Sequence, residues 1–348
     1  MQNVDEGSAT TDEPRLAEWR ERALRVESAV AAAIIGQAEV VRLITVALFT
    51  RGHVLLEGDV GVGKTTVLRA FSRAVSGDFE RVEGTVDLMP TDLVYDARVD
   101  EHGQPRIDPG PLLRHGAGLT TFFFNEINRA RPQVQSLLLR AMAERSVSAF
   151  GREQAFPHMT VFADRNRVER EETFELASAA RDRFLFELNM ATPTEAAVRR
   201  ELVFSTAYHD VDTLMERVDG GVCRGDELNE VAGLIQRSVR SSAELERYVL
   251  ELWAATERPH EYGIQVDGVD MSRLMLAGAS PRGIGATVRS ARTVAWLAGR
   301  DHLTPADLHA VLPAALGHRV FFQAVHELRR SEIAPAFVRS LMDRIASP

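Results

Sequence analysis

The chain has 348 residues with a formal net charge of −9, and 45% of its residues are hydrophobic and 26% charged. This length allows two domains, and the composition is that of an ordinary globular protein. The acidic balance disfavours a dedicated nucleic-acid binder, and no apolar run approaches the roughly 20 residues that span a bilayer. A single cysteine, Cys223, excludes an intramolecular disulfide and a thiolate metal cluster. We therefore expect a cytoplasmic protein without membrane insertion.

The N-terminal part predicts a disordered segment followed by two helices and a strand. Residues 1–14 are polar and acidic, which is typical of a disordered tail and unlike a signal peptide. From Arg15 to Ile35 apolar residues recur at helical spacing, and a second helical pattern begins at Val40. Residues 53–57 then form a short apolar run, which predicts a buried strand.

This strand leads into a glycine-rich run that fits the phosphate-loop pattern G-x-x-x-x-G-K-[ST] at every fixed position: Gly58-Asp59-Val60-Gly61-Val62-Gly63-Lys64-Thr65. Glycines let several backbone N–H groups point at one anion. Lys64 can reach the β and γ phosphates, and Thr65 can offer its hydroxyl to Mg²⁺. Thr66 continues into a helix, whose N-terminus adds affinity for phosphate. A chance turn is the alternative, but the strand–loop–helix context favours binding of ATP or GTP with Mg²⁺.

The next part of the chain predicts the rest of a parallel sheet. Residues 79–82, 120–124, 159–163 and 183–188 are strand candidates, and the unbroken apolar run at 120–124 is typical of a strand covered on both faces. A helix is expected from Pro132. Hairpins are expected with turns at residues 100–103 and at Gly151.

After Pro193 the sequence predicts only helices, at 194–207, 226–239, 243–256, 281–298, 305–314 and 334–345. The expected fold is therefore an α/β domain, with a phosphate-loop parallel sheet flanked by helices, followed by a smaller all-helical domain. We expect the α/β domain at 15–192, the helical domain at 193–322 and a C-terminal helical tail at 323–348.

Two adjacent residues at the end of the 120–124 strand predict the hydrolytic part of the site. Glu126 is placed to act as the general base that polarises water. Asn125 stands where a metal-orienting Asp is usual, and an amide is a poorer partner than a carboxylate for a hard dication. We therefore expect weakened Mg²⁺ affinity or slowed hydrolysis. The alternative is that Asn125 merely ends a strand.

Three more residues are candidates on weaker local signals. Asn166, at the next strand end, could bridge the γ-phosphate and the attacking water, although a strand-end Asn is more often a turn residue. Arg183 could reach a neighbouring subunit's γ-phosphate, and local sequence alone favours a surface ion pair with Asp182. Arg282, in the first turn of a predicted helix, could reach back to the nucleotide or have no special role.

From residue 26 to 323 the chain resembles the MoxR-type AAA+ ATPases. The resemblance is carried by Ile34-Ile35-Gly36-Gln37 with the strand before the phosphate loop, by Asn125-Glu126-Ile127-Asn128-Arg129-Ala130, by Asp182-Arg183-Phe184 and by Gly278-Ala279-Ser280-Pro281-Arg282. It implies that Ile35 and Gly36 contact the nucleotide. It also implies that Asn166 is the sensor-1 residue, Arg282 the sensor-2 residue and Arg183 the arginine finger.

The resemblance further implies a homo-hexameric ring with ATP between subunits, a pore-facing insert at residues 87–112 and a hairpin at 146–156. Implied partners are proteins with a von Willebrand A domain, and the implied work is chaperone-like remodelling or metal insertion. The chain departs from the family pattern at Asn125, where the family has Asp, and at Asp164-Arg165-Asn166-Arg167, where it has T-Q-N-P. It departs again at residues 177–181, where a family carboxylate is missing.

Three functions follow from this sequence. The first is an oligomeric ATPase that remodels a protein partner. The second is a nucleotide-gated scaffold, in which ATP binding assembles the ring with little turnover, as Asn125 would permit. The third is a nucleic-acid motor, which the net charge of −9 disfavours.

Overall fold

The computed structural model describes residues 6–166 and 174–348, which form two compact units. An α/β unit comprises Arg22–Arg183 and Leu188–Asn229, and a helical unit comprises the chain up to Glu21, Phe184–Glu187 and Glu230–Pro348. Arg167, one of the departures from the family pattern, lies outside the described residues. In the described part of the chain, no helix is both long and apolar enough to cross a membrane.

The α/β unit is built on a five-stranded sheet in the order β10-β1-β9-β6-β3. The pairs β1–β9, β6–β9 and β3–β6 are parallel. All seven residues of β6 are buried, as expected for a parallel strand covered on both faces. The strands are β1 (His53–Gly58), β3 (Asp78–Glu83), β6 (Leu119–Asn125), β9 (Thr160–Asn166) and β10 (Phe184–Met190). The predicted phosphate-loop parallel sheet is confirmed.

Helices α2 and α3 contact the central sheet of the α/β unit. In α3, for example, Val67, Leu68 and Phe71 are buried. The helices are α2 (Ala38–Thr50), α3 (Lys64–Ala74), α4 (Pro90–Val94), α5 (Pro132–Glu144), α6 (Ser178–Arg181), α7 (Ala196–Phe204) and α8 (Val211–Glu216), with 3-10 turns at Gly116–Gly118, Ile127–Arg129 and Thr206–Tyr208.

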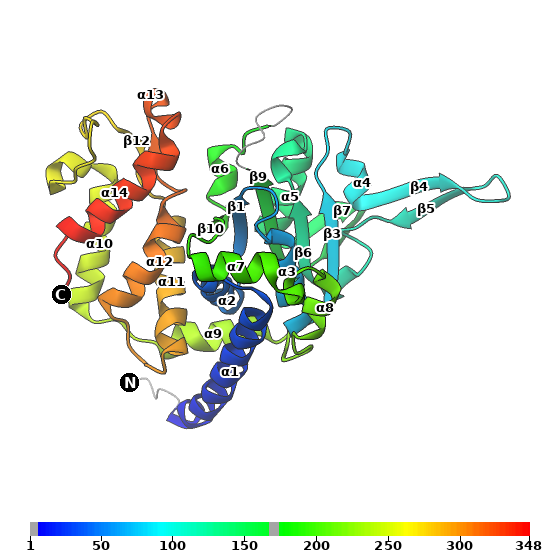
Figure 1. Cartoon of the computed structure of the whole chain (residues 1–348), viewed down its shortest axis with the longest axis horizontal. Helices are drawn as coiled ribbons and strands as arrows, with labels where there is room; N and C mark the ends of the chain where they lie inside the picture. The colour runs from blue at the N-terminus through cyan, green and yellow to red at the C-terminus, as the bar shows by residue number, and fades with distance from the viewer. Residues whose placement is uncertain (1–5, 167–173) are drawn as a thin grey trace. The chain divides into compact units, whose positions relative to one another are not determined.

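Both predicted hairpins are present in the α/β unit. The first joins β4 (Tyr95–Val99) to β5 (Pro105–Pro109) and projects away from the sheet (Figure 1). The second joins β7 (Ser146–Ala149) to β8 (Arg152–Ala155), with Gly151 at its turn. The rings of Tyr95 and Phe150, one from each hairpin, lie 5.6 Å apart between centroids.

The segment after β10 stays with the α/β unit, contrary to the boundary expected between residues 192 and 193. The side chain of Arg73 in α3 donates to the backbone oxygen of Val218, and Arg69 pairs with Asp212 at 2.8 Å. In addition, β11 (Cys223–Arg224) pairs in parallel with β2 (Val75–Ser76). These contacts, distant in sequence, explain why the unit extends to residue 229.

Helix α1 (Glu6–Ala33) begins within the segment that was expected to be disordered. Residues 6–14 therefore continue a helix whose later residues Leu16, Trp19 and Ala23 are buried. Helix propagation costs little once a packed segment has nucleated it, which accounts for the extension.

The helical unit has its own apolar core, and the predicted C-terminal tail is part of that core. Ile333, Phe337 and Leu341 of the last helix are buried. The helices are α9 (Leu228–Ser238), α10 (Ala243–Glu257), α11 (Pro281–Leu297), α12 (Pro305–Leu316), α13 (Ala324–Glu327) and α14 (Arg330–Arg344), with a 3-10 turn at Pro259–Tyr262. A short antiparallel pair, β12 (Met275–Ala277) and β13 (Phe321–Phe322), was not predicted.

Candidate nucleotide-binding and hydrolysis site

The phosphate loop joins the end of β1 to the first residue of α3. Gly61 and Gly63 have φ angles of 83° and 93°, in the left-handed region that favours glycine. A Cβ added at either position would have no atom within 4 Å, so the loop leaves open space beside its backbone. Gly58 is constrained differently, because a Cβ there would lie 2.3 Å from the backbone oxygen of Met190. The loop therefore has the backbone conformation and the room that a phosphate group requires.

Lys64 is held inside this loop. Its side chain is buried, and Nζ donates to the backbone oxygens of Gly58 at 2.7 Å and Asp59 at 3.2 Å. Nζ also donates to Oδ1 of Asn166 at 2.6 Å. Thr65 follows half-buried in the first turn of α3. The ammonium group is thus fixed at the helix N-terminus, where an anion is most favoured.

Glu126 lies at the end of β6 in a left-handed backbone conformation, with φ of 52°. Its Oε1 accepts from Nδ2 of Asn166 at 2.8 Å, and its Oε2 accepts from Arg129 at 3.0 Å. The register of the sheet explains these contacts, because Asn166 on β9 pairs with Gly58 on β1, and β9 also pairs with β6, which ends just before Glu126. The structure therefore joins Lys64, Asn166 and Glu126 in one hydrogen-bonded chain at the carboxyl edge of the sheet.

Asn125 lies beside a carboxylate of the neighbouring strand. It pairs in register with Glu83 of β3, and its Nδ2 donates to Oε1 of Glu83 at 2.5 Å. The amide nitrogen of Asn125 is therefore directed at Glu83. The side chain of Glu83 is 49% exposed and also pairs with Arg81 at 3.0 Å.

Asp164 lies at this site, although in the sequence it stands out only as part of a departure from the family pattern. It is 1% exposed, and its Oδ1 accepts from the backbone N–H of Glu126 at 2.5 Å. Its Oδ2 lies 3.8 Å from Nζ of Lys64. Burial raises the pKa of Asp164 to about 6, against the opposing effects of the Glu126 N–H and Lys64. The sequence signal that could have identified Asp164 is an acidic residue near the end of a predicted buried strand.

Arg129, the other missed residue, could have been found from its spacing. It lies three positions after Glu126, which places its guanidinium beside that carboxylate in the 3-10 turn. An arginine there donates a charge-assisted hydrogen bond that orients the carboxylate.

The other predicted residues lie away from this cluster or have other contacts. Gly36 has φ of 74°, and a Cβ there would lie 2.6 Å from Cγ of Pro193, so it packs against the segment after β10. Its neighbour Ile35 is half-buried. Arg183 precedes β10 and donates to the backbone oxygen of Ala179. Arg282 is an exposed residue of α11 in the helical unit. The nucleotide roles of these four residues remain predictions.

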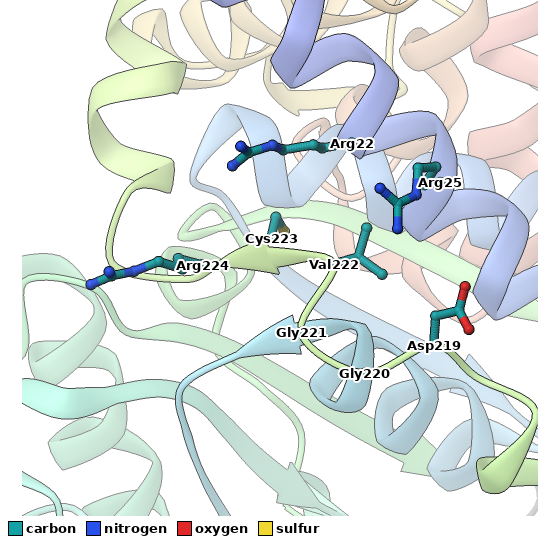
Figure 2. Close-up of a pocket in the computed structure, with 8 residues that line it drawn as sticks. All are labelled: Arg22, Arg25, Asp219, Gly220, Gly221, Val222, Cys223 and Arg224. Atoms are coloured by element: carbon teal, nitrogen blue, oxygen red, sulfur yellow. The ribbon is translucent and has the colours of Figure 1, made fainter.

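A separate hollow of about 580 Å³ in the α/β unit contains none of the predicted site residues. Arg22 and Arg25 from α1 line it together with the loop from Asp219 to Arg224 (Figure 2). Cys223 also lines it, and burial raises the pKa of this thiol to about 12. The thiol therefore stays protonated at neutral pH and is not a nucleophile.

The donor set of the phosphate-loop cluster fits magnesium that arrives with a nucleotide. In the described ranges, no group of three or more His, Cys, Asp or Glu residues could hold a metal ion by itself. Mg²⁺ usually keeps several waters and takes one or two protein ligands together with substrate phosphates. The Thr65 hydroxyl and the amide oxygen of Asn125 are the groups that would serve it.

Comparison with known proteins agrees with this geometry. Residues 53–186 match the ATPase family associated with various cellular activities (AAA), and residues 272–336 match the AAA lid domain. The chain is 54% identical to Protein MoxR of Methylorubrum extorquens over 96% of its length and 97% of that protein. The chain belongs to the MoxR-type AAA+ ATPase family. The resemblance stated from the sequence is thereby confirmed.

Other relatives extend the match. The chain is 47% identical to Protein MoxR of Paracoccus denitrificans, covering 96% of this chain and 98% of that protein. It is 34% identical to Chaperone MoxR1 of Mycobacterium tuberculosis, covering 90% of this chain and 79% of that protein. The crystal structure of a "putative ATPase" from Cytophaga hutchinsonii aligns with a TM-score of 0.81 and 25% identity over 98% of each chain. The chain therefore shares its fold with this structure over 98% of its length.

Proposed function

We propose that this MoxR-type protein binds ATP with Mg²⁺ in the phosphate loop, hydrolyses it slowly and uses the cycle to remodel a protein partner. The observation that carries the proposal is the hydrogen-bonded chain from Lys64 through Asn166 to Glu126. It links the group that contacts phosphate to the group that activates water. Family membership supports ATPase activity.

The geometry suggests a separate role in ATP hydrolysis for each of these residues. Lys64 and the N–H groups of the loop bind the β and γ phosphates and neutralise their charge. Bound Mg²⁺ would add positive charge to the same oxygens. Asn166 contacts both Lys64 and Glu126, so it can orient a water between the γ-phosphate and the base. Glu126, oriented by the hydrogen bond from Arg129, accepts the proton of that water.

Turnover of the intact chain with Glu126→Gln as the matched variant tests this mechanism. The substitution removes the base and keeps the size of the side chain, so kcat should fall by roughly 10²- to 10⁴-fold. Nucleotide affinity should change little, because the contacts of Lys64 with the loop remain. Equal phosphate release by the two proteins would contradict the mechanism.

We propose that ATP hydrolysis is slow because position 125 carries an amide in place of a carboxylate. Its amide N–H donates a hydrogen bond to Glu83, and the amide carries no charge to attract a dication. Asn125→Asp should therefore raise turnover or tighten Mg²⁺-dependent nucleotide binding. Unchanged values of both would remove this part of the proposal.

A protein client and a ring are proposed from the family. One relative bears the name Chaperone MoxR1, and a hexamer would place Arg183 of one subunit near the nucleotide of the next. We propose a partner with a von Willebrand A domain, or another protein that is remodelled or loaded with metal. Sedimentation of the chain with and without ATP tests the ring, and co-purification with such a domain tests the partner.

The second candidate function, a nucleotide-gated scaffold, is favoured by the amide at position 125. In that case ATP would assemble the ring, while phosphate release would be near zero and unaltered by Glu126→Gln. Sedimentation and turnover measured on the same samples separate the two functions.

A further inference from the structure

We propose that Asp164 supplies the negative charge that Asn125 lacks, and that it is the positioning residue which fixes both Glu126 and Lys64. This inference rests on the proposed ATP hydrolysis. It assigns the missing charge to the adjacent strand of the same sheet.

The register of the sheet places Asn125 and Asp164 at the same level along neighbouring strands. Phe124 of β6 pairs with Ala163 of β9, and Asn125 and Asp164 are the next residues on these parallel strands. In-register neighbours of parallel strands project to the same face. A carboxylate on β9 can therefore occupy the neighbourhood that a carboxylate on β6 would otherwise occupy.

One oxygen of Asp164 holds the backbone of the base. Oδ1 accepts from the N–H of Glu126 at 2.5 Å, and Glu126 has the left-handed φ of 52°. That conformation is unfavourable for a non-glycine residue and persists only where the surroundings impose it. The hydrogen bond from Glu126 to a buried carboxylate is such a constraint, and it sets the direction in which the Glu126 side chain points.

The other oxygen of Asp164 faces the phosphate-binding lysine. Oδ2 lies 3.8 Å from Nζ of Lys64, and both side chains are buried, at 2% and 8% exposed. The hydrogen bonds of Lys64 to Gly58, Asp59 and Asn166 all end on neutral oxygens. Asp164 therefore provides the formal negative charge in this ion pair. A buried carboxylate is costly, and this pairing offsets part of that cost.

Glu83 is the competing source of charge. It touches Asn125, but its side chain is 49% exposed and it is neutralised by Arg81 at 3.0 Å. Solvent and Arg81 screen its charge, whereas water is excluded from Asp164. The buried Asp164 therefore has the stronger field at the site.

The test compares Asp164→Asn, Asn125→Asp and the double variant in the intact chain. Asparagine at 164 keeps an acceptor for the Glu126 N–H and removes only the charge. We expect Asp164→Asn to lower kcat at least tenfold and to reduce, at least threefold, the tightening of fluorescent ATP-analogue binding by Mg²⁺. The double variant should recover both values to within about threefold of the original protein. Asp343→Asn, an exposed position on α14, controls for the loss of one charge.

Several outcomes would overturn the inference. Normal turnover and normal Mg²⁺-dependent binding in Asp164→Asn would do so. So would a larger loss in Glu83→Gln than in Asp164→Asn. A lowered melting temperature of Asp164→Asn without recovery by Asn125→Asp would leave a purely structural role for Asp164.

Failure of the proposed hydrolysis is distinguishable from failure of this inference. If the original protein binds ATP without turnover, hydrolysis fails. The effect of Asp164→Asn on Mg²⁺-dependent binding then still decides the role of Asp164, because that measurement needs no catalysis.

Discussion

His53, at the start of β1, predicts a pH dependence of stability that can be calculated from its surroundings. The side chain is buried, with Nδ1 accepting from the backbone N–H of Val161 at 2.9 Å and Nε2 lying 3.3 Å from the backbone oxygen of Met142. A neutral ring protonated at Nε2 satisfies both contacts, whereas a charged ring loses the first. Burial, and secondarily the charge of Arg145, lowers the pKa of His53 from 6.5 to about 3.

Protonation of His53 favours the unfolded chain, because the unfolded chain binds this proton at a higher pH than the folded chain does. Below pH 6.5 the unfolded chain binds a proton at His53 that the folded chain does not bind until about pH 3. The free energy of unfolding therefore falls as the pH is lowered between these values, by about 2 kcal/mol from pH 7 to pH 5 and by about 5 kcal/mol over the full range.

Denaturant unfolding at pH 7 and pH 5 measures this contribution. His53→Asn is the matched variant, because it keeps a polar acceptor and does not titrate. Other groups titrate equally in both proteins, so the loss between pH 7 and pH 5 should be about 2 kcal/mol larger in the original protein. An equal loss in both proteins would show that His53 does not cause this pH dependence.

Three further substitutions test packing and positioning. Gly58→Ala places a Cβ 2.3 Å from a backbone oxygen of β10, so it should lower the free energy of unfolding by about 1–3 kcal/mol and weaken ATP binding. Arg319 is 2% exposed and donates to three backbone oxygens, so Arg319→Met should cost about 3 kcal/mol in thermal unfolding, while Arg339→Met on the exposed face of α14 should cost almost nothing. Arg129→Leu removes a charge-assisted hydrogen bond to Glu126, so kcat should fall about tenfold at unchanged KM in phosphate-release assays.

Local patterns predicted much of the α/β unit. The phosphate loop, the buried strands and both hairpins depend on glycine positions and on apolar runs of short range. These signals are contained in a few neighbouring residues, so they can be recognised without the tertiary structure. The same reasoning placed Glu126 and Asn166 at strand ends, where the parallel sheet brings them together.

The boundary of the α/β unit could not be predicted in this way. The contacts of Arg73 with Val218 and of β2 with β11 join residues about 145 positions apart. A proline after the last central strand is a local signal for a break. It carries no information about whether the following segment packs back onto the preceding one.

The fixed glycines and Lys64 of the phosphate loop predicted the ligand class, and the sequence also revealed the amide at position 125. The groups that surround this amide are brought together only in the folded chain. Glu83 lies on β3, Asp164 on β9 and Glu126 directly after β6, and their hydrogen bonds depend on the register of the sheet. Asp164 is a departure from a family pattern in the sequence, and in the structure it is a buried carboxylate that contacts Glu126 and faces Lys64. The chemistry of each residue is thus local, whereas the electrostatics of the site arise from strands that only folding brings side by side.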